Sequence, residues 1–151
     1  MGNFYTNITI RCGRHEVTPI LSALRRSAWV GEFDGLSVIC DRECEKQDLD
    51  ILASLAMTLS TRLERAALAV LNHDDDVLLF GLYQSGALVS ERGRSKMSGV
   101  PAPSTHKGDF VRAVRSAMGT TARPYAVQGS MWLTFLTRRR ADARRGSAGT
   151  P

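Results

Sequence analysis

The residues of this chain best suited to chemistry lie between two apolar runs, where His73 is followed by Asp74, Asp75 and Asp76. Imidazole and carboxylate groups bind metal ions and act as general acids and bases. Successive side chains of an extended chain point to opposite faces, so neighbouring carboxylates do not converge on one ion unaided. Asp and Asn also favour tight turns, because their side chains bond to nearby backbone. The segment is therefore predicted to be a β-hairpin turn. A metal site or an acid–base role for His73, Asp74 and Asp76 is the alternative.

The three cysteines offer a second candidate site. Cys12 and His15 are separated by two residues, and Cys40 and Cys44 by three, which together supply four possible zinc ligands. Cys40 also ends an apolar run, where it is expected to behave as a small buried hydrophobe. Cys44 begins a predicted helix, whose dipole can lower the pKa of a thiol, so it is the candidate for a reactive cysteine. An odd number of cysteines leaves one unpaired in a monomer, which favours a reducing cytoplasm.

The common catalytic and phosphate-binding motifs are missing from the sequence. It contains no G-x-S-x-G, G-x-x-x-x-G-K-[ST], G-x-G-x-x-G or H-E-x-x-H pattern. Asp48 and Asp50 stand near the start of a predicted helix, where acidic residues interact favourably with the dipole. The sequence therefore favours a protein without a cofactor and without catalytic activity, and leaves enzymatic alternatives only at the sites named above.

Apolar periodicity predicts an α+β fold. Residues 4–11 alternate, with Thr6, Ile8 and Ile10 on one side, and Asp34-Gly35 between two short β-prone runs is a strong hairpin signal. Pro19 is expected in the first turn of its helix, where its missing N–H costs little. Strands are predicted over 4–11, 28–33, 36–40, 66–71, 77–83 and 87–91, and helices over 15–26 and 44–65. This order predicts a ferredoxin-like βαββαβ antiparallel sheet with an added β-hairpin and with its helices on one face.

The composition changes near residue 91. Residues 1–90 contain eight Arg/Lys and twelve Asp/Glu, a net charge of −4, whereas residues 91–151 contain twelve and three, a net charge of +9. We therefore expect an α+β domain over 1–91 and a basic, partly disordered extension over 92–151, rich in Gly, Ser, Pro and Arg. One or two short helices are predicted in this extension, one of them over 109–119, capped by Asp109 and ended by Gly119. The chain has no apolar run long enough to span a membrane, and no secretory signal is expected.

Three segments of the first 90 residues resemble a known family. These are MGNFYTNITI at the start, DRECEKQD from Asp41, and ALAVLNHDDDVLLFGLY, which contains the His73 segment. They are similar to a family of small uncharacterised bacterial proteins that open with MGNFYTN and carry an LNHDDDV segment. The resemblance covers about residues 1–90 and implies no known activity.

These observations favour a cytoplasmic, non-enzymatic interaction module that binds a protein partner or a second copy through the open face of its sheet. Candidates for that face are Tyr5, Trp29, Phe33 and Tyr83. The alternative is a nucleic-acid-associated protein, because the basic end could neutralise phosphates without reading sequence, with Trp132 and Phe135 available to stack on bases. The cations expected to make such contacts are Arg138, Arg139, Arg140, Arg144 and Arg145.

Overall fold

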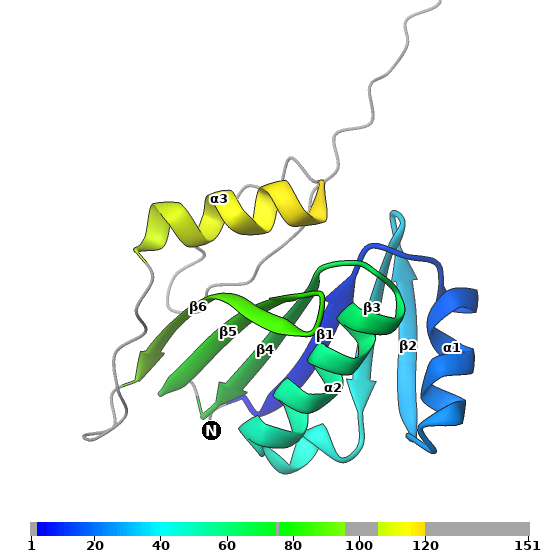
Figure 1. The fold of residues 1–151 in the computed structure, drawn as a ribbon. Helices are drawn as coiled ribbons and strands as arrows, with labels where there is room; N and C mark the ends of the chain where they lie inside the picture. The colour runs from blue at the N-terminus through cyan, green and yellow to red at the C-terminus, as the bar shows by residue number, and fades with distance from the viewer. Residues whose placement is uncertain (1–2, 75, 96–105, 120–151) are drawn as a thin grey trace, which may run out of the picture. The chain divides into compact units, whose positions relative to one another are not determined.

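Six antiparallel strands form one sheet in the order β2-β3-β1-β4-β5-β6 (Figure 1). The structure is a computed structural model that describes residues 3–74, 76–95 and 106–119. Along the chain the elements are β1 (Tyr5–Ile10), α1 (Arg14–Ala23), β2 (Ala28–Phe33), β3 (Leu36–Asp41), the 3₁₀ helix η1 (Cys44–Lys46), α2 (Leu49–Arg62), β4 (Ala67–His73), β5 (Val77–Gln84), β6 (Ala87–Ser95) and α3 (Lys107–Met118). All of them belong to the compact unit Met1–Thr120.

The predicted α+β class with an antiparallel sheet is confirmed. The complete strand order is not that of a four-stranded ferredoxin-like sheet, because β5 and β6 extend the sheet beyond β4. β1 lies in the interior, paired with β3 on one side and with β4 on the other. The two edges are therefore β2 and β6.

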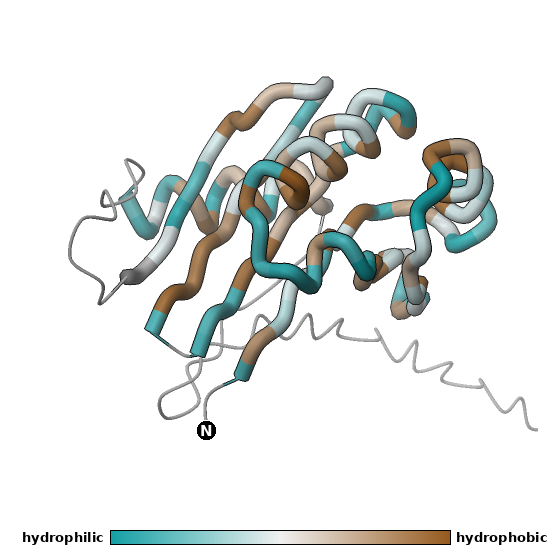
Figure 2. Tube along the Cα trace, turned by 90° about the horizontal axis from the view of Figure 1, so that it is seen from below, coloured by the Kyte–Doolittle hydropathy of each residue, from teal (hydrophilic) through white to brown (hydrophobic). Residues whose placement is uncertain are grey.

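The main core lies between the sheet and the helices α1 and α2. Ile8 and Ile10 of β1, predicted to share a face, are both buried there, together with Val17 of α1 and Leu59 of α2. Figure 2 shows hydrophobic stretches along the central strands. Burial of these apolar side chains supplies most of the favourable free energy of folding.

Helix α3 packs on the opposite face of the sheet, so the helices do not all lie on one face (Figure 1). Its Phe110 ring lies 6.0 Å from the ring of Phe80 on β5, and Phe80 points away from the α1–α2 side. Near its C-terminal end, the carbonyl oxygen of Met118 accepts a hydrogen bond from Nε of Arg11. No helix among the described residues is long and apolar enough to cross a membrane.

Two of the predicted hairpins are confirmed by their turns. Asp34 and Gly35 adopt φ angles of 51° and 73° between β2 and β3. Ser85 and Gly86 adopt 51° and 78° between β5 and β6. Positive φ at both central residues matches the right-handed twist of the strands, and glycine accepts it without strain.

The single helix predicted over 44–65 is wrong, because the chain forms two elements there. Gln47 ends η1 in a left-handed conformation, with φ 65°. Asp48 then caps α2 by accepting the backbone N–H groups of Asp50 and Ile51. Pro19 is also not in the first turn but inside α1, which begins at Arg14.

The C-terminal part of the described chain differs from the predicted linker. β6 continues past Glu91 to Ser95, because its residues pair with β5 as far as Val77. α3 is capped by His106 rather than by Asp109, and its predicted end at Gly119 is confirmed by a left-handed φ of 59°. The rest of the expected extension, 96–105 and 120–151, lies outside the described residues.

Candidate functional site

The segment of His73 closes the hairpin between β4 and β5, as predicted. His73 pairs with Val77, and the backbone N–H of Asp76 donates to the carbonyl oxygen of His73 at 3.1 Å. Asp74 takes the left-handed position of the turn, with φ 51°. The ring of His73 meets the ring of Phe4 edge to face, with 4.9 Å between centroids. The imidazole therefore packs on an aromatic side chain at the end of the sheet.

The alternative of a metal site gains no geometric support. Across residues 3–74, 76–95 and 106–119, no three His, Cys, Asp or Glu side chains are grouped so that they could hold an ion. His73 and Asp74 are exposed, and Asp75 lies outside the described residues. The described residues of the turn therefore offer no set of ligands that converge on one point.

The four residues considered for zinc are not brought together. Cys12 and Cys44 are buried in the core on the α1–α2 side of the sheet. Cys40 lies on the other face, opposite Trp29 of β2. His15 is exposed on α1. All three cysteines are free thiols.

Cys44 is not an activated thiol, and the prediction of a lowered pKa is wrong. Burial raises its pKa to about 12, and the neighbouring carboxylate of Asp41 acts in the same direction. The guanidinium of Arg26, 3.7 Å from Sγ, opposes these effects without offsetting them. At neutral pH the side chain is therefore a neutral, buried thiol rather than a nucleophile.

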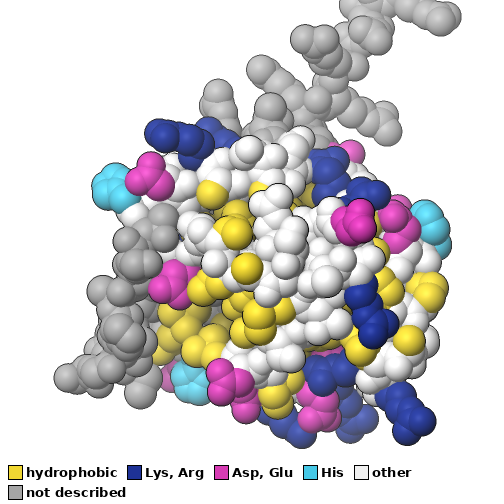
Figure 3. Space-filling model, viewed as in Figure 1, with side chains coloured by type: hydrophobic (Ala, Val, Ile, Leu, Met, Phe, Trp, Pro, Cys, Tyr) yellow, Lys and Arg dark blue, Asp and Glu magenta, His cyan; other side chains and the backbone are white. Residues whose placement is uncertain are grey.

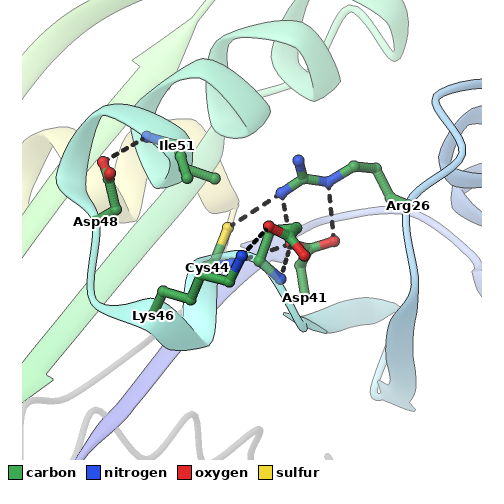
Figure 4. A network of polar contacts seen from close by, with 7 residues as sticks. Arg26, Asp41, Cys44, Lys46, Asp48 and Ile51 are labelled. Atoms are coloured by element: carbon green, nitrogen blue, oxygen red, sulfur yellow. Dashed lines mark hydrogen bonds and ion pairs between the residues drawn. The ribbon is translucent and has the colours of Figure 1, made fainter.

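The polar network around Asp41 stabilises the segment between β3 and α2 (Figure 4). Nε and Nη2 of Arg26 donate to the Asp41 carboxylate at 3.0 and 2.5 Å. The backbone N–H groups of Glu43 and Cys44 donate to Oδ1 at 3.0 and 3.1 Å. Asp41 is only 1% exposed, so these bonds replace the water that its charge has lost. Sequence reasoning missed this pair, since the two residues are fifteen positions apart and follow no local pattern.

A groove of about 410 Å³ lies beside this network, between the end of α1 and the start of α2. Two of its polar side chains already have partners within the protein: Arg26 is bound to Asp41, and Oδ1 of Asp48 caps α2. No cysteine or histidine is among the residues that line it. It is lined by Leu24, Arg26, Asp48, Asp50, Ile51, Ser54, Leu55 and Thr58.

The most distinctive surface lies on edge strand β2, on the face opposite α1 and α2. Trp29 and Phe33 are 66% and 60% exposed, although aromatic side chains of this size are usually at least half buried. They share this face with the half-buried Val38 and Cys40 of β3. We call these four side chains, together with the outer backbone of β2, the β2 surface.

Two of the other residues predicted for the open face lie elsewhere or are less exposed. Tyr83 is 8% exposed and belongs to the α1–α2 core, because it pairs with Ala67 on that face. Burial raises the pKa of its phenol, and the charge of Glu91 adds to the effect. Tyr5 lies on the open face but is half-buried. The open face is therefore smaller than predicted, and its exposed aromatic residues are concentrated on β2.

Gly31 determines how the indole of Trp29 lies. A Cβ atom added at Gly31 would lie 2.4 Å from Cη2 of Trp29, closer than side chains can approach. The indole ring therefore lies directly over the glycine. The indole therefore covers the strand between Trp29 and Phe33, so that the two aromatic side chains form one strip. The sequence signal for this arrangement is the alternation W-x-G-x-F, in which all three residues share a face.

The backbone of β2 is open on its outer side. The carbonyl oxygen of Ser27 accepts a hydrogen bond from the backbone N–H of Arg42. Hydrogen-bonded pairs recur at every second residue of an antiparallel ladder, so Trp29, Gly31 and Phe33 direct their N–H and C=O groups toward β3. Ala28, Val30 and Glu32 therefore direct their N–H and C=O groups away from β3. Among the described residues, no hydrogen bond uses these outward groups.

Figure 3 shows the side of the molecule that carries α2, where charged side chains of both signs are interspersed around hydrophobic ones. A mixed surface of this kind does not resemble a nucleic-acid footprint, which is a patch of one sign. The cations predicted to contact phosphates, Arg138 to Arg140, Arg144 and Arg145, lie outside the described residues, as do Trp132 and Phe135.

Comparisons with protein-family models, with curated proteins and with solved structures found no match to this chain.

Proposed function

We propose that this chain is a non-enzymatic interaction module that binds a protein partner through the β2 surface. The observation that carries the proposal is the strip of Trp29 and Phe33, exposed on an edge strand while α3 covers the far half of the same face. Exposed apolar side chains beside an unpaired strand edge form a template for a partner strand.

The energetics support binding rather than a structural role for the strip. Each of the two aromatic side chains can bury about 150–250 Å² in a contact. At about 25 cal/mol per Å² of apolar surface removed from water, covering this area with a partner would contribute several kcal/mol of favourable binding free energy. Tryptophan is also one of the residue types enriched among the side chains that dominate binding energies.

We further propose that β1 to β4 with α1 and α2 form a ferredoxin-like unit, to which β5, β6 and α3 have been added. The order β2-β3-β1-β4 of these four strands supports this assignment. The resemblance over residues 1–90 supports membership of the bacterial family described above. The three free thiols support a reducing, cytoplasmic location. Fold alone does not define the partner.

Affinity capture tests the proposed function. The full chain is used as bait in a lysate of the source organism, beside a variant carrying Trp29→Ser and Phe33→Ser. Because both side chains are exposed, the variant should keep its circular dichroism spectrum and melting temperature. We expect specific capture by the native chain and at least a tenfold loss with the variant. Equal capture by both baits, or no self-association and no capture by the native chain, would refute the proposal.

A further inference from the structure

We infer that the partner of the β2 surface is a second copy of this chain, joined by antiparallel pairing of the two β2 strands. The inference rests on the proposed function, because it names the partner of the same surface. In this arrangement a two-fold axis passes beside Gly31, and the two sheets become one continuous sheet.

The outward backbone groups are complementary to themselves in this register. Val30 of one copy lies opposite Glu32 of the other, and the axis repeats the pair. Both residues direct their N–H and C=O groups outward, so each pair can exchange both of its hydrogen bonds. A shift by one residue would place outward groups opposite inward ones and lose these bonds.

The same register pairs the exposed aromatic side chains. Trp29 of one copy lies opposite Phe33 of the other at a non-hydrogen-bonded position, where Cα atoms approach to about 4.5 Å. Cross-strand aromatic pairs of this kind contribute favourably to sheet stability. Gly31 faces Gly31 at the axis, and its missing side chain leaves room for the two indoles that already lie over it.

Charge complementarity selects a second copy and the antiparallel direction. Arg25 and Arg42 are exposed beside the beginning of β2, whereas Glu32 and Asp34 are exposed at its end. The carboxylate of Glu32 also accepts the backbone N–H of Arg14 at 2.8 Å within the same chain and keeps its negative charge there. An antiparallel mate places the basic end of each strand beside the acidic end of the other. A parallel mate would place like charges together.

The size of the contact predicts a reversible dimer. β2 has six residues, and its two aromatic side chains contribute only part of the roughly 800 Å² that each partner buries in a standard interface. The dimer should therefore dissociate on dilution rather than persist at all concentrations.

Sedimentation equilibrium of the full chain, from about 1 to about 300 µM, tests this inference. We expect the average mass to rise from 16.5 kDa toward twice that value. Glu32→Pro removes an outward N–H that no described residue of the monomer uses, together with the carboxylate that accepts the N–H of Arg14, and should raise the dissociation constant at least tenfold. Glu32→Ala, the matched control, loses the same carboxylate but keeps this N–H, and should weaken the dimer much less. Trp29→Ser should weaken it as strongly as the proline does, and it decides the question if Glu32→Pro fails to fold.

The outcomes separate this inference from the proposed function. A native chain that stays monomeric overturns the dimer, and capture of another protein that depends on Trp29 then leaves the proposed function standing. Monomer without capture overturns both. A dimer that survives Trp29→Ser and a folded Glu32→Pro forms through another surface, and also overturns the inference.

Discussion

The carboxylate of Asp41 accepts two hydrogen bonds from the guanidinium of Arg26, at 3.0 and 2.5 Å. Asp41 is buried, whereas the side chain of Arg26 is 22% exposed, so the pair joins a desolvated charge to one that still reaches water. The carboxylate also holds the backbone of the segment that follows β3. The role that this geometry supports is the stability of the turn rather than catalysis.

Asp41→Asn should lower the free energy of unfolding by about 2–4 kcal/mol, because it removes one partner of a buried ion pair and places an amide among N–H donors. Urea unfolding measures the effect. Glu43→Gln is the control, because the partner of the Glu43 carboxylate among the described residues is the exposed Lys46, and its midpoint should not move. Equal effects of the two variants would contradict the structural role of Asp41.

The buried thiol of Cys44 should make the protein less stable at alkaline pH. Its folded pKa of about 12 lies above the ordinary value of 9.0, so the folded chain holds the proton more tightly. This contribution is complete below pH 9 and is lost as the pH rises toward 12, with about 1.4 kcal/mol lost at pH 10. Unfolding free energies at pH 8 and pH 10 measure it. Cys44→Ala should reduce this difference, and an unchanged difference would contradict the assignment.

The hydrogen bond that Ser60 makes between α2 and the β5–β6 hairpin is expected to stabilise the fold. The buried hydroxyl of Ser60 accepts the backbone N–H of Gly86 at 3.0 Å and donates to Met57. Ser60→Ala leaves the N–H of Gly86 unpaired and should cost about 1–3 kcal/mol in a denaturant titration. Thr58→Ala on the same helix loses only a bond to its own helix, and should change stability by less than about 0.5 kcal/mol. Reversed effects would argue against the connection.

Helix α3 should be part of the folded unit rather than of a detachable extension. A chain ending at residue 119 should unfold cooperatively, whereas one ending at residue 95 should expose the β5 face and bind the dye ANS. Phe110→Ala in the full chain should cost about 3–5 kcal/mol, because Phe110 is buried against Phe80. If the chain ending at residue 95 were as stable as the longer one, α3 would not contribute to the core.

Gly31→Ala should displace the indole of Trp29 without unfolding the protein. The new methyl group would meet the exposed end of a side chain that can swing away. In a Trp132→Phe background, we expect a shift in tryptophan emission and a melting temperature within a few degrees of the parent. Unchanged emission would show that the ring does not lie over Gly31.

The local signals of the sequence predicted much of the fold. Asp34-Gly35 predicted a hairpin turn, and the alternation of Thr6, Ile8 and Ile10 predicted a strand with one buried face. The structure confirms both predictions. The break at Gln47 was not visible, because a glutamine in the left-handed region follows no propensity rule. The extension of β6 was missed for a related reason. Its Arg-Gly-Arg-Ser end has a loop-like composition, which pairing with β5 overrides.

The error at Tyr83 has a physical cause: β5 is not amphipathic. This strand is apolar at nearly every position, so a period of two does not show which side faces α1 and α2. It is apolar on both sides because α3 covers the side that carries Phe80. Phe110, Val114 and Met118 recur at helical spacing, and that pattern could have identified α3 as a core helix.

The interior position of β1 has a consequence for how the chain acquires its structure during synthesis. β1 leaves the ribosome before its neighbour β4, which begins only at Ala67, so the second ladder of β1 waits for more than fifty further residues. The β4–β5–β6 meander, in contrast, is built from contacts close together along the chain. Pairings between strands close in sequence form early, whereas pairings between strands far apart in sequence form slowly and limit the folding rate. The nascent chain therefore carries β1 with one unpaired edge until β4 has emerged, and closure of the ladder between β1 and β4 is expected to limit the folding rate.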